Sequence, residues 1–384
     1  MTAQNLQFTA FPLPGPARCA TLKLYRSRTG ANKREECKAE QAILEECAQY
    51  SSLRAEEFQK LLVPHFAFVK DAHFQIQNQS PNSHWYSFFF REVAFYEDDG
   101  QYITADRKTV ASVDGYADLS QLFKRSISPE GEIVYYPVLL KDSTTCDETL
   151  IVHYTNGSTQ TLTAEPFQRY NERIEGDAVT EYHKDGEIPV FTIDSCYDGV
   201  MDEIMAGAIM VARYPVGIVD IRANMGGSDS VSETWLRQYT HANHLMYRNQ
   251  FLMNVFSGLS GYEDGWVEND RVLVVLTSKN VASAAETFVD MAHNVENVLF
   301  IGENTWGAQV TSAAYHIWLP NSKCVVTMGH GLFEVPQDWD YYKELRGYEP
   351  DLWVPADEAE ELAVKLMENL GAVQAEGEAS SPAA

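Results

Sequence analysis

Three apolar runs in the second half of the chain constrain its fold more than any other feature. The segments VGIVDI (216–221), RVLVVLTS (271–278) and NVLFIGE (297–303) are almost continuously hydrophobic, and segments with helical spacing follow the first two. Strands without polar alternation belong inside a parallel sheet that helices cover on both faces. We therefore predict an α/β core of alternating strands and helices over residues 189–370.

The first half of the chain carries two other patterns. Apolar residues recur at helical spacing from Lys33 to Phe68, which predicts two helices, with Ser51 or Ser52 as the N-cap of the second. From residue 74 to 188, aromatic and β-branched runs alternate with turn signals such as DDG and NGS, which is typical of a β-rich region. This region is either a degenerate PDZ-like module that binds an extended peptide at a strand edge, or a β-subdomain without a ligand.

The 384 residues are enough for two or three domains. The residues of the C-terminal tail are small and polar, and they bury too little apolar surface to fold by themselves. The predicted organisation is an N-terminal lead and helical segment at 1–73, the β-rich region at 74–188, the α/β core at 189–370 and a disordered tail at 371–384.

The charge balance narrows the class of partner. The chain has 29 Lys and Arg residues against 55 Asp and Glu residues, a net charge of −26. A basic stripe that displaces counterions from phosphates is missing, which argues against nucleic acids and anionic membranes and leaves peptides and small molecules as ligands. No apolar run approaches the roughly 18 residues of a membrane span. The first residues lack a signal-peptide pattern, so we expect a cytoplasmic protein, or an extracytoplasmic one if an export signal has been trimmed. The oligomeric state is not determined by the sequence.

Six cysteines are spread over the chain without a CxxC pair or histidines at ligand spacing. We therefore expect no zinc site or redox centre. The cysteines are predicted to be ordinary buried thiols, which suit a reducing compartment. No motif for a metal or another cofactor is present. The cysteines are Cys19, Cys37, Cys47, Cys146, Cys196 and Cys324.

The segment DIRANMGGSDS (220–230) is the first candidate for chemistry. Gly226 and Gly227 stand between a buried strand and a helix, where glycines allow backbone N–H groups to point into a cleft. Such donors hold a phosphate or an oxyanion. The alternative is a plain strand–helix turn with a structural pair of Asp220 and Arg222.

The second candidate is Ser283, in the segment TSKNVASAAETF (277–288). It stands at the start of a helix after a buried strand, and its small alanine neighbours allow a substrate backbone to approach the hydroxyl. The alternative is a helix N-cap, because Ser is a preferred cap and Glu286, three residues on, completes a capping box.

Three further motifs are weak when taken singly. They are GENTWG (302–307), KELRGYEPD (343–351) and KDAHFQI (70–76), and the last contains His73. Taken together and in this order, the five motifs resemble the C-terminal-processing (tail-specific) family of serine proteases, from about residue 40 to 360. The resemblance is strongest over 189–355, and it implies a crotonase/ClpP-like fold for the α/β core.

The resemblance also distinguishes two catalytic arrangements. In the processing proteases proper, a lysine serves as general base, but Ala308 occupies its position here, 25 residues after Ser283. A Ser–Lys dyad is therefore not expected. The tricorn-core-like branch of the family uses Ser, His and Glu, and the segment DAH ending at His73 is similar to its D-x-H motif. Glu344, six residues before Pro350, matches its glutamate, and Glu349 is the second choice because Leu345 replaces an asparagine of the family pattern.

These residues together predict a serine endopeptidase that hydrolyses peptides or unfolded protein tails. A serine hydroxyl needs a base, and His73 has the chemistry for that role. Glu344 would orient the imidazole. The prediction depends on His73 meeting Ser283, about two hundred positions later in the chain. The predicted oxyanion donors are the N–H groups of Ala284 and of Gly227 or Gly226, with Ser228, Ser230 and Ser312 as outer donors.

Two other functions stay open. The first is a catalytically inactive relative that binds peptides or apolar ligands, because the alanine at 308 is also what loss of activity would leave. The second is a crotonase-type acyl-CoA enzyme, whose fold shares the alternating core and a two-donor oxyanion hole. The acidic composition and the lack of a basic cluster for the CoA phosphates argue against it.

Overall fold

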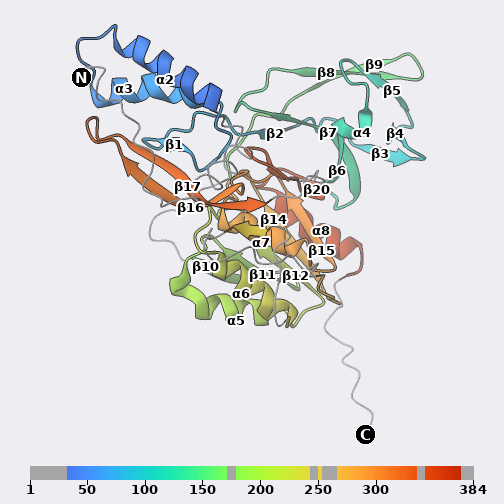
Figure 1. Ribbon diagram of the computed structural model, residues 1–384. Coiled ribbons are helices and arrows are strands. Elements are labelled where there is room, and N and C mark those ends of the chain that lie inside the picture. Colours follow the sequence, from blue (N-terminus) through green and yellow to red (C-terminus); the bar gives the residue numbers. More distant parts are fainter. Residues whose placement is uncertain (1–32, 171–178, 243–249, 253–265, 335–341, 373–384) are drawn as a thin grey trace. The chain divides into compact units, whose positions relative to one another are not determined.

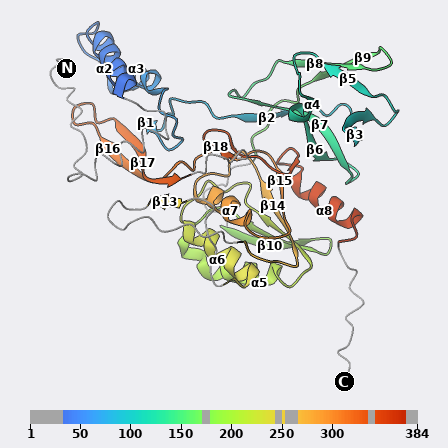
Figure 2. The same ribbon diagram turned by 45° about the vertical axis from the view of Figure 1, so that its right-hand side comes forward.

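A computed structural model describes residues 33–170, 179–242, 250–252, 266–334 and 342–372 (Figures 1 and 2). The chain divides into two compact units, each built from three separate stretches. The hairpin unit comprises Met1–Ser83, Tyr247–Glu263 and Gly307–Leu345. The sheet unit comprises His84–Met246, Asp264–Trp306 and Arg346–Ala384. The lead at 1–32 and the tail beyond residue 372 lie outside the described residues.

This division differs from the predicted segments. The sequence places residues 307–345 inside a continuous α/β core at 189–370, whereas they belong to the hairpin unit. There β17 (Val325–Glu334) pairs with β1 (Gln75–Ile76), so the segment after residue 73 also joins this unit. The pairing joins residues about 250 positions apart, and a local sequence pattern carries no information on it.

The sheet unit contains the predicted α/β core. Its six strands follow the order β10, β11, β12, β14, β15 and β20; all neighbours are parallel except β10, which is antiparallel to β11. Each of the three apolar runs forms one of these strands, as predicted. The strands are β10 (Thr180–Asp185), β11 (Ile188–Ile193), β12 (Val216–Asp220), β14 (Val272–Thr277), β15 (Val298–Gly302) and β20 (Leu352–Trp353), and the short β19 (Gly347–Tyr348) precedes the last.

Helices cover both faces of this sheet, which explains why its strands are apolar throughout. On one face, Val274 and Leu276 of β14 share a core with Leu362 of α8. On the other face, Gly217 contacts Val211 of α5, where an added Cβ would lie 2.3 Å from the valine side chain. The helical elements of this part are η3 (Asp198–Val200), α5 (Met201–Val211), α6 (Asp229–Thr240), α7 (Ala284–Ala292) and α8 (Ala359–Asn369).

The β-rich part of the sheet unit contains a five-stranded and a three-stranded sheet around a separate core. Phe95 and Phe123 meet edge to face in this core, with ring centroids 4.9 Å apart. The prediction of a β-rich region is confirmed, and its description as PDZ-like stays a prediction. The elements are β2 (Tyr86–Phe89), β3 (Phe95–Asp98), β4 (Gln101–Thr104), β5 (Val110–Val113), α4 (Leu119–Leu122), β6 (Phe123–Ile127), β7 (Ile133–Lys141), β8 (Thr149–Tyr154) and β9 (Thr159–Thr163).

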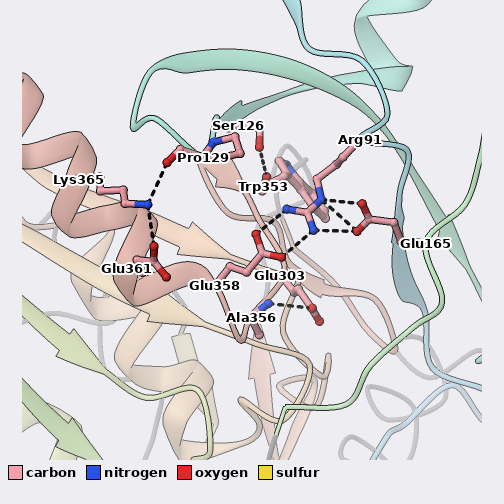
Figure 3. A network of polar contacts seen from close by, with 10 residues as sticks. All are labelled: Arg91, Ser126, Pro129, Glu165, Glu303, Trp353, Ala356, Glu358, Glu361 and Lys365. Carbon is pink, nitrogen blue, oxygen red and sulfur yellow. Dashed lines mark hydrogen bonds and ion pairs between the residues drawn. The ribbon is translucent and has the colours of Figure 1, made fainter.

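Arg91 joins the β-rich part to α8 within the sheet unit (Figure 3). Its guanidinium pairs with Glu165 at 2.8 Å and with Glu358, the residue before α8, at 2.6 Å. Nearby, Ser126 donates to the carbonyl of Trp353 in β20 at 2.5 Å. Arg91 is half-buried, which favours the neutral form, but its hydrogen bonds to Glu358 and Glu165 outweigh this effect and raise its pKa. The β-rich part is thus attached at the β20 and α8 edge of the large sheet.

The hairpin unit begins with the two predicted helices, which pack on β1 and β17 through a small core containing Ile43, Phe58 and Ile76. Its second helix is capped by Arg54, not by Ser51 or Ser52, because the Arg54 N–H donates to Glu57 at 2.9 Å. The elements are α2 (Lys33–Cys47), α3 (Ala55–Leu62), η2 (Val63–Phe66), β1, β13 (Gln250–Leu252), β16 (Thr311–Trp318), β17 and β18 (Tyr342–Lys343).

The cysteines agree only in part with the prediction of buried thiols. In the described residues, Cys196 and Cys324 are buried, whereas Cys37 is exposed and Cys47 and Cys146 are half-buried. Burial raises the pKa of Cys196 to about 11, so this thiol is neutral at physiological pH. Cys19 lies outside the described residues.

Candidate active site

Ser283 lies in the sheet unit, at the sharp turn between β14 and α7. Its backbone has φ 54° and ψ −121°, a conformation that costs a non-glycine residue about 1–3 kcal/mol. Glu286 completes the expected capping box, since its carboxylate accepts the Ser283 N–H at 3.2 Å. In the same box the Ser283 side chain accepts the backbone N–H of Glu286, which explains why a serine begins this helix. The capping box does not explain the strained turn, and strain of this kind collects at functional sites.

A loop of residues 224–227, the glycine loop, packs directly on this turn. An added Cβ at Gly226 would lie 2.9 Å from the Ser283 Cβ and 3.0 Å from the Ala284 nitrogen, so the two backbones are in contact. Gly226 has φ +101° and Gly227 has φ +140°, values that favour glycine. Asn224 fixes the contact, because its carbonyl accepts the Ala282 N–H at 3.2 Å.

The three predicted oxyanion donors differ in their hydrogen bonds. The Gly226 N–H donates to Asn224 Oδ1 at 2.8 Å, so it is already engaged. The N–H groups of Gly227 and Ala284 donate to no protein atom in the described residues. Gly226 therefore contributes close backbone contact, while Gly227 and Ala284 carry the N–H groups that an oxyanion would need.

Asp220 and Arg222, at the beginning of the DIRANMGGSDS motif, have a structural role. Arg222 pairs with Asp220 at 2.6 Å and with Glu360 of α8 at 2.9 Å, and it also donates to the Ala356 carbonyl at 2.7 Å. Asp220 and Arg222 are both buried. They anchor the end of β12 to α8, as the structural interpretation of this pair predicts.

Of the three candidate outer donors, the structure describes the side chains of two, Ser228 and Ser230. Ser228 and Ser230 hydrogen-bond to each other at 2.7 Å, and Ser230 also donates to Asp198 at 2.8 Å. The side chain of Ser312 lies outside the described atoms. Ser228 and Ser230 thus form a small network of their own beside the glycine loop.

A buried lysine lies in the chain just before Ser283. Lys279 Nζ donates to the carbonyls of Thr305 and Trp306, at 2.6 Å and 3.3 Å, and so holds the GENTWG segment. Burial lowers the pKa of Lys279 to about 7, although Glu286 and Glu303 act in the opposite direction. Burial also raises the pKa of Glu303 to about 7. This amine fixes a turn of the sheet unit, whereas Ala308 at the family's lysine position is a buried residue of the hairpin unit.

His73 lies in the hairpin unit between η2 and β1. Its side chain is 15% exposed, and its Nδ1 lies 3.2 Å from the Thr311 hydroxyl, at the start of β16. The His73 N–H donates to Asp71 Oδ1 at 2.9 Å, which closes a tight turn around the DAH segment. His73 is thus held by contacts of both its backbone and its ring.

Glu344 lies in the same unit, and its carboxylate is buried. Burial and the neighbouring Asp71 raise its pKa to about 8, while the surrounding donors favour the charged form. Its Oε1 accepts the N–H of Ala72, the residue before His73, at 2.8 Å. The other donors to this carboxylate are the backbones of Gln309 and Val310, at 3.1 Å and 2.9 Å, and the Tyr342 hydroxyl at 2.5 Å.

The second-choice glutamate has other partners. Glu349 belongs to the sheet unit, where it pairs with Arg346 and, at 3.3 Å, with Lys124. Glu344 is therefore the glutamate bonded to the DAH segment. Ser283 and the glycine loop lie in the sheet unit, and His73 and Glu344 lie in the hairpin unit.

The comparisons with known proteins bear on the segment of the chain that contains Ser283. Residues 191–353 match the model of peptidase family S41. No curated protein sequence matches the chain. The similar solved structures include the photosystem II D1 C-terminal processing protease (14% identity, 90% of this chain and 94% of that chain, TM-score 0.38), mature CPAF (11%, 92% and 94%, 0.48) and the tricorn protease (14%, 92% and 34%, 0.38). These TM-scores lie below 0.5, so the match to the family model over residues 191–353 is the finding that bears on function.

The S41 match supports a peptidase of the serine-protease type that acts on peptides or proteins. It extends from β11 to β20 and includes Ser283, both glycines and Glu344, whereas His73 precedes it. The mixed α/β fold with several sheets agrees with this family. In the described residues, no three or more His, Cys, Asp or Glu side chains are grouped to hold a metal ion, and no helix has the length and hydropathy of a membrane span.

The sequence alone did not identify three polar residues that contact the candidate residues or their segments. Asp71 was visible only as the first letter of the D-x-H motif, and Thr311 belongs to no motif. Lys279 stands between apolar runs and a helix, where its burial could have been inferred from the hydrophobic residues on both sides. Only the fold shows which groups these side chains contact.

Proposed function

We propose that the chain is a serine endopeptidase of the Ser/His/Glu branch, with Ser283 as nucleophile, His73 as general base and Glu344 as the residue that orients it. The observation that carries the proposal is the strained Ser283 turn, packed against the glycine loop inside the segment that matches peptidase family S41. The parallel sheet with helices on both faces supports a crotonase/ClpP-like description of the core.

The chemistry follows from the environment of Ser283. A hydroxyl at a strand-to-helix turn of this kind is presented to a substrate by the backbone itself. The N–H groups of Gly227 and Ala284 are the donors proposed for the tetrahedral oxyanion, and the start of α7 adds the positive end of a helix dipole. Removing one such donor typically lowers kcat by about 10²–10³.

A base has to be supplied from the hairpin unit. His73 is the candidate, since an imidazole accepts a proton near neutral pH and its segment is held by Asp71 and Glu344. Glu344, bonded to the backbone next to His73, would orient the base through that segment.

The substrate is proposed to be an extended peptide or an unfolded protein tail. Two large apolar side chains are exposed here, Met225 within the glycine loop (54%) and Tyr197 in the segment bonded to it (58%). Cys196, next to Tyr197, donates its N–H to the Gly226 carbonyl at 3.0 Å, so both side chains are attached to the loop that packs on Ser283. They are placed to contact apolar residues of a peptide.

Labelling with a fluorophosphonate probe tests the nucleophile. We expect the wild type to be labelled and Ser283→Ala to be unlabelled, with unchanged circular dichroism. Ser158→Ala is the matched control, because Ser158 lies in an exposed turn and bonds to Asn156. A folded wild type that is never labelled would reject the proposal. Binding of peptides without cleavage would then favour an inactive relative, and turnover of a CoA thioester would favour the crotonase-type function.

A further inference from the structure

Asp71, Thr311 and His73 form a chain of hydrogen bonds inside the hairpin unit. The Thr311 hydroxyl donates to Asp71 Oδ1 at 2.8 Å, and the Thr311 hydroxyl oxygen lies 3.2 Å from His73 Nδ1. Asp71 Oδ1 is itself 4.0 Å from Nδ1, beyond hydrogen-bond distance. The threonine therefore connects the carboxylate to the imidazole.

The direction of these bonds fixes where the protons lie. A carboxylate only accepts hydrogen bonds, so the single Thr311 proton points to Asp71. The Thr311 oxygen then offers a lone pair to the imidazole, and the matching partner is a protonated Nδ1. In the neutral ring, a proton on Nδ1 leaves Nε2 unprotonated. This is the tautomer that a general base toward a serine needs when its Nε2 faces the hydroxyl.

The surroundings hold this arrangement in place. Asp71 is fully buried and Thr311 is 1% exposed, so water competes little for either group. Asp71 Oδ1 also accepts the His73 N–H, which ties the carboxylate to the backbone of the residue that it serves. Thr311 is the first residue of β16, whose pairing with β17 fixes its position.

We propose that Asp71 and Thr311 are positioning residues that hold His73 as its Nδ1–H tautomer, with Nε2 as the proton acceptor. The proposal rests on the proposed function, in which His73 is the base for Ser283. It adds a second carboxylate to the site, one that acts on the ring of the base through a hydroxyl. Glu344 acts on the backbone of the preceding residue.

Thr311→Val tests the relay, because valine keeps the shape of threonine and removes the hydroxyl. Thr311→Ser keeps the hydroxyl. Thr327→Val is the matched control: Thr327 lies on the neighbouring strand and makes the same kind of bond, 3.0 Å to His316 Nδ1. We expect Thr311→Val to lower the rate of fluorophosphonate labelling by about tenfold or more. Thr311→Ser and Thr327→Val should stay within about twofold of the wild type.

Nitrogen-15 NMR of the histidine rings gives a readout that does not depend on activity. Signals are assigned to His73 by comparison with His73→Ala. We expect a protonated Nδ1 in the wild type and a shift of the proton toward Nε2 in Thr311→Val, with no change in Thr327→Val. An unchanged His73 tautomer, or labelling of Thr311→Val at the wild-type rate, would overturn the relay. Absence of labelling in the wild type would reject the peptidase proposal instead, and the NMR result would still decide the tautomer.

Discussion

At the scale of single residues, the contact between Gly226 and Ser283 sets the geometry of the proposed nucleophile. A side chain at Gly226 would place its Cβ 2.7 Å from the Ala282 carbonyl oxygen, closer than real Cβ contacts occur. The neighbouring backbone would have to move, and Ser283 already occupies a strained conformation. The glycine is thus required by space as well as by its positive φ.

Gly226→Ala should therefore abolish fluorophosphonate labelling of Ser283 through displacement of the turn. Gly157→Ala separates this effect from backbone strain, because Gly157 also has a positive φ, +85°, but an added Cβ there meets no atom within 4 Å. We expect Gly157→Ala to lose about 1 kcal/mol of stability and to keep its labelling. Equal labelling of the two variants would show that the contact at Gly226 does not control the serine. Thermal unfolding of both checks that they fold.

At the scale of elements, α8 is where several parts of the sheet unit converge. Its apolar face covers the central strands, Glu360 pairs with Arg222 after β12, and Glu358 at its start pairs with Arg91 from the β-rich part. Arg91, like Arg222, bridges two carboxylates (Figure 3). Removing it would leave Glu165 and Glu358 facing each other without a cation.

Arg91→Met should lower the free energy of unfolding by about 1–2 kcal/mol, less than for a fully buried pair because both glutamates are partly exposed. Arg237→Met is the control, since Arg237 makes one exposed pair with Glu233 on the surface of α6, worth about 0.5 kcal/mol at most. Urea unfolding followed by tryptophan fluorescence measures both. Similar losses in the two variants would mean that the Arg91 junction adds nothing beyond a surface ion pair.

At the scale of the whole molecule, the proposed catalytic residues are distributed over the two compact units. Ser283 and the glycine loop are in the sheet unit, and His73 with Glu344 is in the hairpin unit. The oxyanion donors and the nucleophile therefore need no residue of the hairpin unit for their own geometry. His73, in contrast, belongs to the hairpin unit. Its removal should leave the sheet unit folded and slow the reaction of Ser283.

His73→Ala should lower the labelling rate by about 10²–10⁴, the usual contribution of a general base, without changing the unfolding temperature by more than a few degrees. His65→Ala is the control, because His65 lies in the same unit and pairs with Glu46 at 2.9 Å on the surface. Added imidazole should restore part of the rate in His73→Ala alone. A His73→Ala protein labelled at the wild-type rate would show that another group accepts the serine proton.

The parts of this fold that could be predicted are those governed by local patterns. The apolar run that contains Val274 and Leu276 identifies a strand buried on both faces, and the small residues around Ser283 identify a helix start with a capping box. The pairing of β17 with β1 is not local, so no sequence pattern indicated that residues 307–345 cluster with the N-terminal helices. For the same reason Thr311 gave no signal, since its role depends on Asp71, 240 positions earlier.

The interleaved chain path has a consequence for how such a molecule can be divided. The polypeptide leaves the sheet unit after Trp306 and returns at Arg346, so neither unit corresponds to an uninterrupted stretch of sequence. A fragment that stopped at residue 306 would leave β1 without its partner strand, and one that started at residue 84 would have no His73. A cut at either boundary would therefore disrupt both units, and neither unit could be produced as a single uninterrupted fragment or transferred by domain shuffling.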